Sequence, residues 1–329
     1  MSSLVGSAHE ETCRVDHPKV RPVDRRWSVH PANPSRRTEA AGGRTASMAS
    51  RIPPTRDLFV TRLFGWHDTT RRELVIREAS TPWEILVAEV MSHQTGIERV
   101  GLAWRRFVTL WPTPRALAGA PTSELLSAWS GLGYNRRALA LREAARVITA
   151  NHDGQVPASV EALDALPGIG PYTARAVAAS AFDALVAPLD VNVRRVVSRV
   201  TGVEDNLQEA ADALVSPGEP RRWLDAVMDL AALVCTPVPR CAGCPLADIC
   251  ASAGAVVPAA PRTPSVSFPT TRRWLRGRLV QLLTVAGGEW VTLPDELGSH
   301  GPDAIGQAIA ALAREGFAEV DAGRARICA

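Results

Sequence analysis

Four cysteines in the last third of the chain constrain its fold more than any other feature. They are Cys235, Cys241, Cys244 and Cys250, spaced C-x5-C-x2-C-x5-C within 16 residues. The N-terminal sequence has no apolar signal segment, so disulfides are disfavoured and the thiols are expected to stay reduced. Thiols this close in a reducing compartment are typical of metal ligands. We therefore predict a metal-binding loop over residues 235–250.

The spacing of these cysteines bears on which metal they bind. Zinc ribbons usually pair two C-x2-C knuckles, and only Cys241 and Cys244 form one here. An iron–sulfur cluster takes four thiolates and accepts irregular loop spacing. Zinc stays open, but the pattern favours a cluster. Two further cysteines, Cys13 and Cys328, lie outside this group and are expected to be incidental.

Basic residues exclude one class of chemistry without establishing another. The chain has 329 residues and 37 lysines and arginines, of which Lys19 is the sole lysine. A Schiff-base lysine in a folded core is therefore excluded. Residues 1–57 carry a net charge of +4 and residues 58–329 a net charge of −1, so bulk charge does not predict nucleic-acid binding. No apolar window has the length of a membrane span, which predicts a cytoplasmic protein.

The composition divides the chain into four parts. Residues 1–57 are rich in Arg, Pro, Ser and Ala without apolar periodicity, and we expect a disordered tail. Residues 58–250 have helical periodicity throughout and no convincing strand. Residues 251–268 look like a linker. Residues 269–329 hold two helical patterns, each followed by a short apolar or alternating run, which predicts a small winged-helix-like module.

The helical part contains a strong start signal at Thr81-Pro82-Trp83-Glu84, where Thr81 is the expected N-cap and Glu84 closes a capping box. Glu89 follows on an otherwise apolar face. A carboxyl group there should have a raised pKa, which suits a proton donor. A solvent-facing helix position is the alternative. Further helices are expected at 97–110, 123–130, 135–151, 158–165, 172–182, 191–201, 206–215 and 220–234.

Two loops in this part carry chemistry. Leu166-Pro167-Gly168-Ile169-Gly170 lies between two helices, and its glycines allow a tight turn whose amides suit a phosphate. A plain helix–helix turn is the alternative. Asp190 precedes another helix, where the free N–H groups of the first turn stabilise a carboxylate. Taken alone, Asp190 could be simply the N-cap of that helix, without a role in catalysis.

Taken together, these features resemble the helix–hairpin–helix (HhH-GPD) DNA glycosylases over about residues 72–250. The resemblance rests on Thr81-Pro82-Trp83, Glu89-Val90-Met91, Gln94-Thr95, Gly131-Leu132-Gly133-Tyr134, Leu166–Gly170, Asp190–Val196 and the four cysteines. It implies an all-α, two-lobed fold with a [4Fe-4S] cluster loop and a monovalent cation at the hairpin. It also implies double-stranded DNA with a mispair as partner, a monomer, and a place on the nucleoid.

Two positions decide the branch within this superfamily. Lyase members carry a catalytic lysine just after the hairpin, where this chain has Tyr172. The MutY-like branch has a glutamate at the position of Glu89 and a following Gln-Thr, which Gln94 and Thr95 match. The resemblance therefore implies a monofunctional glycosylase that removes adenine mispaired with guanine or 8-oxoguanine.

The resemblance also assigns roles to residues. Glu89 would be the general acid, Asp190 would stabilise the oxocarbenium-like sugar, and Tyr172 and Asn192 would line the base pocket. The implied DNA contacts are Gln94 as a wedge, Thr95, Tyr134, Gly168, Gly170 and Arg194. Three neighbouring arginines, Arg136, Arg137 and Arg195, are further candidates for phosphate contacts.

The chain departs from the family pattern in three places. The usual Met-Leu-Gln-Gln-Thr is Met91-Ser92-His93-Gln94-Thr95, the first cysteine gap is one residue shorter than usual, and no Phe-Ser-His loop of a Nudix-like domain is present. His93 and the missing domain motivate one alternative, a mismatch thymine or uracil glycosylase. The winged-helix-like module motivates another, a non-catalytic DNA-binding iron–sulfur protein.

Overall fold

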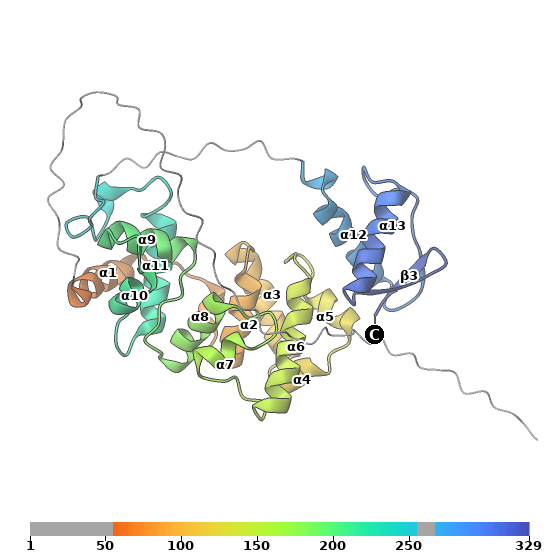
Figure 1. The fold of residues 1–329 in the computed structure, drawn as a ribbon, viewed down its shortest axis with the longest axis horizontal. Helices are drawn as coiled ribbons and strands as arrows, with labels where there is room; N and C mark the ends of the chain where they lie inside the picture. Colours follow the sequence, from red (N-terminus) through yellow and green to blue (C-terminus); the bar gives the residue numbers. More distant parts are fainter. Residues whose placement is uncertain (1–54, 255–266, 329) are drawn as a thin grey trace, which may run out of the picture.

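A computed structural model of the protein describes residues 55–254 and 267–328 (Figure 1). Most of the expected tail and linker, residues 1–54 and 255–266, therefore lies outside the described residues. Helix α1, Arg56–Thr70, begins one residue before the predicted end of the tail at residue 57. The described part before residue 255 is helical without a strand, so the predicted all-α class is confirmed. No described helix is long and apolar enough to cross a membrane.

Helices α2 to α7 form one lobe with the short helix η1. Their bounds are Val75–Glu78 for η1, Pro82–Ser92 for α2, Ile97–Leu110 for α3, Pro114–Ala118 for α4, Thr122–Ala128 for α5, Arg136–Asn151 for α6 and Val160–Asp164 for α7. Helix α3 has the predicted bounds, whereas α4 and η1 were not predicted. Both are only about one turn long, too short for an apolar period to register.

A second lobe joins α1 to α9, Val191–Thr201, α10, Leu207–Leu214, and α11, Pro220–Leu233. Helix α8, Pro171–Phe182, belongs to both lobes. Val177 and Ala178 lie in the core of the first lobe, and Ala176 lies in the core of the second. Small side chains on α8 allow both lobes to pack closely on it, and Figure 1 shows α8 where the lobes meet.

The start of α2 forms as its sequence predicts. The Thr81 hydroxyl accepts a hydrogen bond from the Glu84 amide at 3.2 Å, and the Glu84 carboxylate accepts one from the Thr81 amide at 3.1 Å. Trp83 is buried and its Nε1 donates to the Trp111 carbonyl at 2.9 Å. A capped and anchored first turn fixes the rotation of α2, and so fixes where Glu89 points.

The hairpin between α7 and α8 packs directly on α6. Gly168 has φ of +74°, and a Cβ at this position would lie 2.5 Å from the Cβ of Ala140. Both the left-handed backbone and the close approach require glycine. Pro171 then starts α8 at its first position. The hairpin is thereby held rigidly beside the point where the lobes meet.

The C-terminal module consists of two helices and a small antiparallel sheet. Helices α12, Arg272–Val285, and α13, Pro302–Arg314, precede a hairpin of β2, Ala318–Asp321, and β3, Arg324–Ile327. β1, Val291–Thr292, pairs with the other side of β3, giving the order β1-β3-β2. Ala322 and Gly323 both have positive φ, as a two-residue hairpin turn requires. Helix α12 packs against α5 of the first lobe.

Candidate active site and cysteine loop

Glu89 lies on α2 where the two lobes meet. Protein atoms surround its carboxyl group although part of the side chain meets solvent. In the part of the chain that the structure describes, this carboxyl group makes no hydrogen bond and no ion pair. Burial first, and then the negative charges of Asp225 and Asp190, raise the pKa of Glu89 to about 7, against a smaller opposing effect of Arg221. A carboxyl group with this pKa can both donate and accept a proton near neutral pH.

Asp190 caps the N-terminus of α9, as predicted. Its Oδ1 accepts hydrogen bonds from the amides of Asn192 at 2.8 Å and Val193 at 2.7 Å. Its Oδ2 accepts a hydrogen bond from the Asn192 side chain at 2.7 Å. These donors fix the orientation of the carboxylate and stabilise its negative charge. The cap and an electrostatic role toward Glu89 coexist in one residue.

Asn192 connects Asp190 to the cysteine loop. Its Oδ1 accepts a hydrogen bond from Arg195 Nη2 at 3.0 Å, and Arg195 Nε donates to the Cys235 carbonyl at 2.7 Å. Arg195 also donates to the carbonyl of Ala231. The Nε and Nη2 atoms of Arg195 thus join α9 to the start of the cysteine loop, and the expected phosphate contact of Arg195 stays a prediction.

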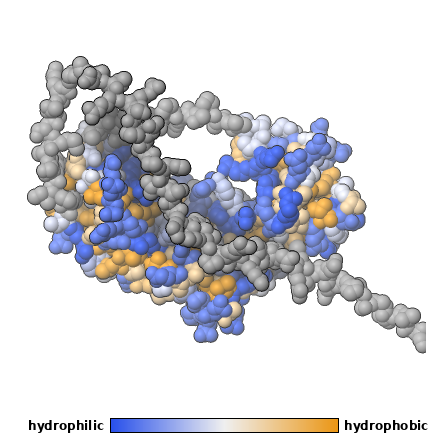
Figure 2. Space-filling model, viewed as in Figure 1, coloured by the Kyte–Doolittle hydropathy of each residue, from blue (hydrophilic) through white to orange (hydrophobic). Residues whose placement is uncertain are grey.

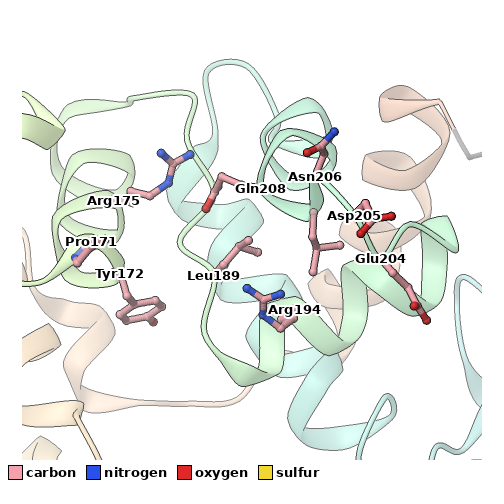
Figure 3. Close-up of a pocket in the computed structure, with 10 residues that line it drawn as sticks. Pro171, Tyr172, Arg175, Leu189, Arg194, Glu204, Asp205, Asn206 and Gln208 are labelled. Carbon is pink, nitrogen blue, oxygen red and sulfur yellow. The ribbon is translucent and has the colours of Figure 1, made fainter. Parts of the chain in front are cut away.

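Tyr172 occupies the first turn of α8, directly after the hairpin. Burial and the nearby charges of Glu89 and Asp190 raise the pKa of its hydroxyl, which therefore stays neutral. Tyr172 and Arg194 share the lining of an open pocket between α8, α9 and the start of α10 (Figure 3). Glu89, Tyr172 and Asp190 are thus electrostatic neighbours, while Arg194 reaches the adjoining pocket.

The turn after α2 holds Gln94 in a strained backbone conformation. Gln94 has φ of +52° and an exposed side chain. Thr95 is half-buried, and its hydroxyl accepts a hydrogen bond from Arg137 Nη2 at 2.9 Å. Arg137 Nη1 donates to the carbonyl of His93 at 2.7 Å. Gln94 remains open to a ligand, whereas Thr95 is engaged inside the protein.

Arg137 does not lie as expected. It also donates to the carbonyls of Val90, Met91, Leu132 and Gly133. The prediction of a phosphate contact is wrong, because these acceptors draw the guanidinium inward between α2 and the loop before α6. Arg136, by contrast, is exposed at the start of α6. Sequence alone does not separate two adjacent arginines that face opposite ways.

Tyr134 ends the loop between α5 and α6 and is 42% exposed. Its φ is +48°, and the glycines before it, Gly131 and Gly133, also have positive φ. The hairpin, which packs on α6, presents two amides. Among the described residues, the amides of Gly168 and Gly170 donate to no protein acceptor, so both remain open to an external ligand.

The four cysteines line one pocket on the second lobe, together with apolar residues such as Val200 and Leu230. Burial, with smaller contributions from the other cysteines of the group, raises the pKa of Cys244 to about 11. No three His, Cys, Asp or Glu side chains within the described residues lie close enough to hold one metal ion. The donor set is four thiols around a shared, largely apolar space.

The loop that carries the cysteines is fixed by Arg199 of α9. Its Nη1 donates to the Thr236 carbonyl at 2.7 Å and lies 3.5 Å from Cys235 Sγ. Its Nη2 donates to the Pro237 carbonyl at 3.1 Å. An arginine at this place supplies positive charge beside thiolates.

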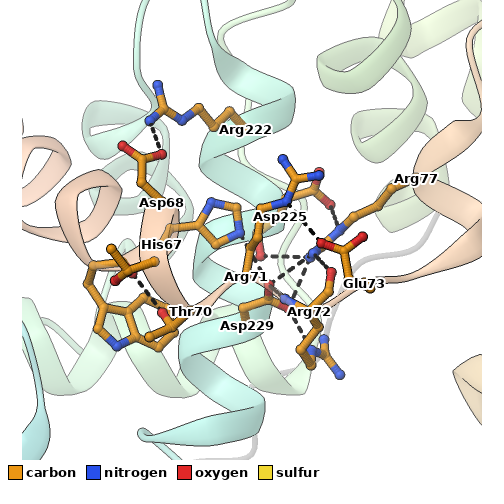
Figure 4. Close-up of polar contacts among 12 residues, drawn as sticks. His67, Asp68, Thr70, Arg71, Arg72, Glu73, Arg77, Arg222, Asp225 and Asp229 are labelled. Carbon is orange, nitrogen blue, oxygen red and sulfur yellow. Dashed lines mark hydrogen bonds and ion pairs between the residues drawn. The ribbon is translucent and has the colours of Figure 1, made fainter.

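A buried ion network behind Glu89 was not predicted from the sequence (Figure 4). Asp225 of α11 accepts a hydrogen bond from Arg77 Nε at 3.1 Å, and Arg221 donates to the Arg77 carbonyl at 2.9 Å. Arg77 also donates to Asp229 at 3.0 Å. These partners are about 150 positions apart, and no local pattern signals such contacts. An unusual run of arginines and carboxylates on α11 was the only available sign.

Comparison with known proteins agrees with this architecture. Residues 87–220 match the model of the HhH-GPD superfamily base excision DNA repair proteins. The solved structure of a thermostable thymine-DNA glycosylase superposes with a TM-score of 0.57 at 30% identity, covering 60% of this chain and 95% of that one. An endonuclease III–DNA complex superposes with a TM-score of 0.51 at 24% identity, covering 61% and 97%, which shows the fold alone.

Relatives found by sequence identify the family within the HhH-GPD superfamily. The adenine DNA glycosylase of Mycobacterium tuberculosis is 42% identical over 246 residues, covering 69% of this chain and 78% of that protein. That of Mycolicibacterium smegmatis is 42% identical over 231 residues, covering 67% and 78%. The rat adenine DNA glycosylase is 36% identical over 211 residues, covering 58% and 41%. The chain belongs to the adenine DNA glycosylase family of the HhH-GPD superfamily.

Proposed function

We propose that this protein hydrolyses the N-glycosidic bond of adenine mispaired with guanine or 8-oxoguanine in double-stranded DNA. The observation that carries the proposal is the environment of Glu89. This carboxyl group is unbonded among the described residues, has a pKa of about 7, and lies in the electrostatic range of Asp190 and Tyr172. It does so in a chain that is 42% identical to curated adenine DNA glycosylases.

In the proposed reaction, Glu89 donates its proton to a ring nitrogen of the flipped adenine. The N-glycosidic bond then breaks, the bonding electrons leave with the base, and positive charge develops on the sugar. The fixed carboxylate of Asp190 stabilises this charge, because its orientation is already set by three hydrogen bonds. Glu89, now ionised, accepts a proton from the water that attacks the sugar. Tyr172 and Asn192 shape the pocket around the base.

The DNA contacts in this proposal come from the exposed loops. Gln94 and Tyr134 have left-handed backbones that project their side chains from tight turns. The free amides of Gly168 and Gly170 hold a phosphate with a monovalent cation, and Arg194 supplies a charge at the rim of the adjoining pocket. Thr95 stabilises the turn after Gln94 through Arg137.

The reaction is proposed to be monofunctional. A lyase step requires an amine to form a Schiff base with the abasic sugar. Lys19 is the chain's sole lysine, and Tyr172 stands directly after the hairpin. We expect no covalent complex with abasic DNA after borohydride treatment. A trapped complex at substantial yield would contradict this part of the proposal.

A [4Fe-4S] cluster fits the cysteine loop better than zinc does. Cys235, Cys241, Cys244 and Cys250 line one largely apolar pocket. Their sequence contains one C-x2-C pair, whereas zinc ribbons usually have two, and an iron–sulfur cluster accepts irregular loop spacing between its four thiolates. When bound, such a cluster supplies four covalent links that hold the loop. Iron content with broad visible absorption supports it, and a colourless zinc protein contradicts it.

One experiment tests the main proposal. Purified protein is incubated with A:8-oxoguanine, A:G, T:G and U:G duplexes, and abasic sites are then cleaved with alkali. We expect cleavage of the A-containing strands alone. The superposition on a thymine-DNA glycosylase at 30% identity and the His93 departure favour a mismatch thymine or uracil glycosylase as the second candidate. Product from T:G or U:G alone would select that candidate.

A non-catalytic DNA-binding role is separated by the same panel. Wild-type protein that binds duplexes but releases no base would favour it. The Glu89→Gln variant is the matched control: it keeps the size of the side chain and removes its acidity. Loss of base release with retained mismatch binding supports catalysis by Glu89.

We also propose that the protein binds DNA as a monomer. Light scattering of the protein–DNA complex tests this.

A further inference from the structure

Tyr134 is held between two arginines that come from different parts of the chain. Arg137 of α6 lies 5.7 Å from the centroid of the Tyr134 ring, and Arg273 of α12 lies 5.4 Å from it. Arg273 Nη1 also donates to the Tyr134 hydroxyl at 2.6 Å, and its guanidinium stacks on Phe268 at 5.1 Å. Arg137 belongs to the first lobe, whereas Arg273 and Phe268 belong to the C-terminal module.

The module is fixed to the first lobe by apolar packing. Leu275, Leu279 and Leu283 of α12 are buried in the same cluster as Leu125 and Leu126 of α5, against which α12 packs. The contact of Arg273 with Tyr134 therefore does not depend on a loose tether. Arg273 and Tyr134 are both exposed and lie beside this apolar packing.

The charges of the module are unevenly distributed. Helix α12 carries four arginines and no carboxylate. Arg276 pairs with Glu315, and the hairpin arginines Arg324 and Arg326 pair with Asp321 and Glu319. Arg272 and Arg273 are exposed, and neither pairs with a carboxylate among the described residues. Arg278, further along α12, is exposed as well and donates to Gln281. What sets Arg272 and Arg273 apart is that they are adjacent and that Arg273 contacts Tyr134.

Two facts separate this end of α12 from an ordinary solvated helix face. An arginine stacked between two aromatic rings has already lost much of its side-chain freedom, so a ligand need not order it. A guanidinium fork presents parallel donors to a phosphate, and Arg272 stands next to it at the same turn. Figure 2 shows hydrophilic residues gathered on the side of the module that faces the core.

We propose that the C-terminal module is part of the DNA interface, and that Arg272 and Arg273 bind the phosphate backbone of the duplex next to the Tyr134 loop. Arg273 has a second role as a positioning residue, since it holds Tyr134 in the left-handed conformation from which the side chain projects. The proposal rests on the proposed function, because Tyr134 marks the DNA-facing side. Duplex DNA is favoured over an acidic protein because regularly spaced phosphates match two adjacent guanidinium groups.

Arg273→Gln in the full-length protein tests the proposal, with Arg278→Gln as matched control. Arg278 is exposed on the same helix but contacts Trp274 and Gln281 instead of the Tyr134 loop. Affinity for an A:8-oxoguanine duplex is measured from about 0.05 to 0.3 M salt. We expect Arg273→Gln to weaken binding roughly tenfold and to reduce the salt slope by about one, while Arg278→Gln changes neither.

Two further variants keep the test decisive. Arg272→Gln leaves the Tyr134 contact intact and should still reduce the salt slope by about one. Arg273→Gln combined with Tyr134→Phe should weaken binding by less than the product of the single effects, because both changes break one contact. The single-turnover rate at saturating protein should stay within about threefold of wild type in the Arg278→Gln control, which shows that a change on this helix does not by itself disturb the chemistry.

Equal affinity and salt slope in Arg272→Gln, Arg273→Gln and Arg278→Gln would overturn the proposal. That result is distinct from failure of the proposed function, which would show as absence of adenine release by the wild-type protein. The proposal would also be overturned if an acidic polypeptide displaced the duplex completely and the protein no longer preferred the duplex to it. That result would assign the surface to a protein partner.

Discussion

Glu89 and Asp229 are two carboxyl groups that protein atoms surround, and their hydrogen-bond partners differ completely. The Asp229 side chain is fully buried and accepts hydrogen bonds from Arg72 Nε at 2.6 Å, from the Arg72 amide at 3.0 Å and from Arg77 Nη1 at 3.0 Å. His67 Nε2 lies 3.2 Å away as a further partner. Glu89 has no such partner among the described residues.

The pKa values of the two groups follow from this contrast. Burial alone would raise the pKa of Asp229, but hydrogen bonds from Arg77 and Arg72 hold it below its usual range. At Glu89, burial and two negative neighbours raise the pKa, and the charge of Arg221 offsets only a small part of that rise. A buried carboxylate whose oxygens are hydrogen-bonded stays ionised and contributes to the fold. A buried carboxyl group without such partners has a raised pKa and can exchange a proton near neutral pH.

Asp225 links the two regions. Arg77 binds Asp225 and Asp229 together, and the Asp225 charge is the second cause of the raised pKa of Glu89. The ion network therefore supports the candidate active site in two ways. Its hydrogen bonds join Arg77 of η1 to Asp225 of α11. They also hold the Asp225 carboxyl group where its charge acts on Glu89.

The largest expected effect concerns Glu89. Glu89→Gln should reduce the single-turnover rate of adenine release by about 10³-fold, within the range for loss of a general acid. Because Glu89 ionises in the folded state only at high cost, the variant should gain stability above pH 7, on the order of 2 kcal/mol. Quench-flow or gel assays give the rate, and urea unfolding at pH 8 gives the stability. Full activity in this variant would remove Glu89 from the mechanism.

Removing Asp229 should act on stability instead. Asp229→Ala removes the fully buried partner that the partly buried Arg72 and Arg77 share, and among the described residues Arg77 then keeps only Asp225 as an ion-pair partner. We expect a loss of about 3 kcal/mol of unfolding free energy. Asp68→Ala is the control, because Asp68 is 61% exposed and pairs with Arg222 at the surface. We expect less than about 1 kcal/mol there. Similar losses of unfolding free energy in both variants would mean that the network around Asp229 contributes no more to stability than a surface ion pair does.

A third prediction concerns pH. Glu89 acts in its protonated form, so the rate of base release should be constant below pH 7 and fall tenfold per unit above it. Asp225→Asn removes a negative neighbour and should move this upper limb to lower pH. At pH 7.5, we expect the variant to be roughly tenfold slower. The full profile, measured under single-turnover conditions, checks the direction; a limb displaced to higher pH would contradict it.

The contrast also explains how much the sequence could predict. The capping box at Thr81, the helix start at Asp190 and the hairpin glycine Gly168 depend on neighbours within a few positions, so local patterns were sufficient. The network around Asp229 depends on partners about 150 positions away. The hydrogen bonds that Arg137 and Arg195 donate to backbone carbonyls of other elements have no side-chain signature.

In its number of partners, His93 is intermediate between Glu89, which has none among the described residues, and Asp229, which has several. Changing it should give the smallest effect of the variants considered. It has one side-chain partner, Thr173 Oγ1, 2.8 Å from its Nε2, and packs edge-on against Tyr172. Burial, and then the charge of Arg137, lowers the pKa of His93. Its contribution to stability is therefore present above pH 6.5 and is lost as the pH falls, because the folded protein resists protonation at this site.

His93→Gln, which restores the residue usual in the family, should keep a hydrogen bond to Thr173 and change the unfolding free energy by less than about 1 kcal/mol at pH 7.5. The variant should lose less stability than wild type between pH 7.5 and pH 5, since it removes a group that must be protonated on unfolding. Adenine release should stay within about threefold. A shift of product from A:G to T:G duplexes in either protein would instead make His93 a determinant of base choice. Urea unfolding at the two pH values and the duplex panel separate these outcomes, because a structural role changes the first measurement alone.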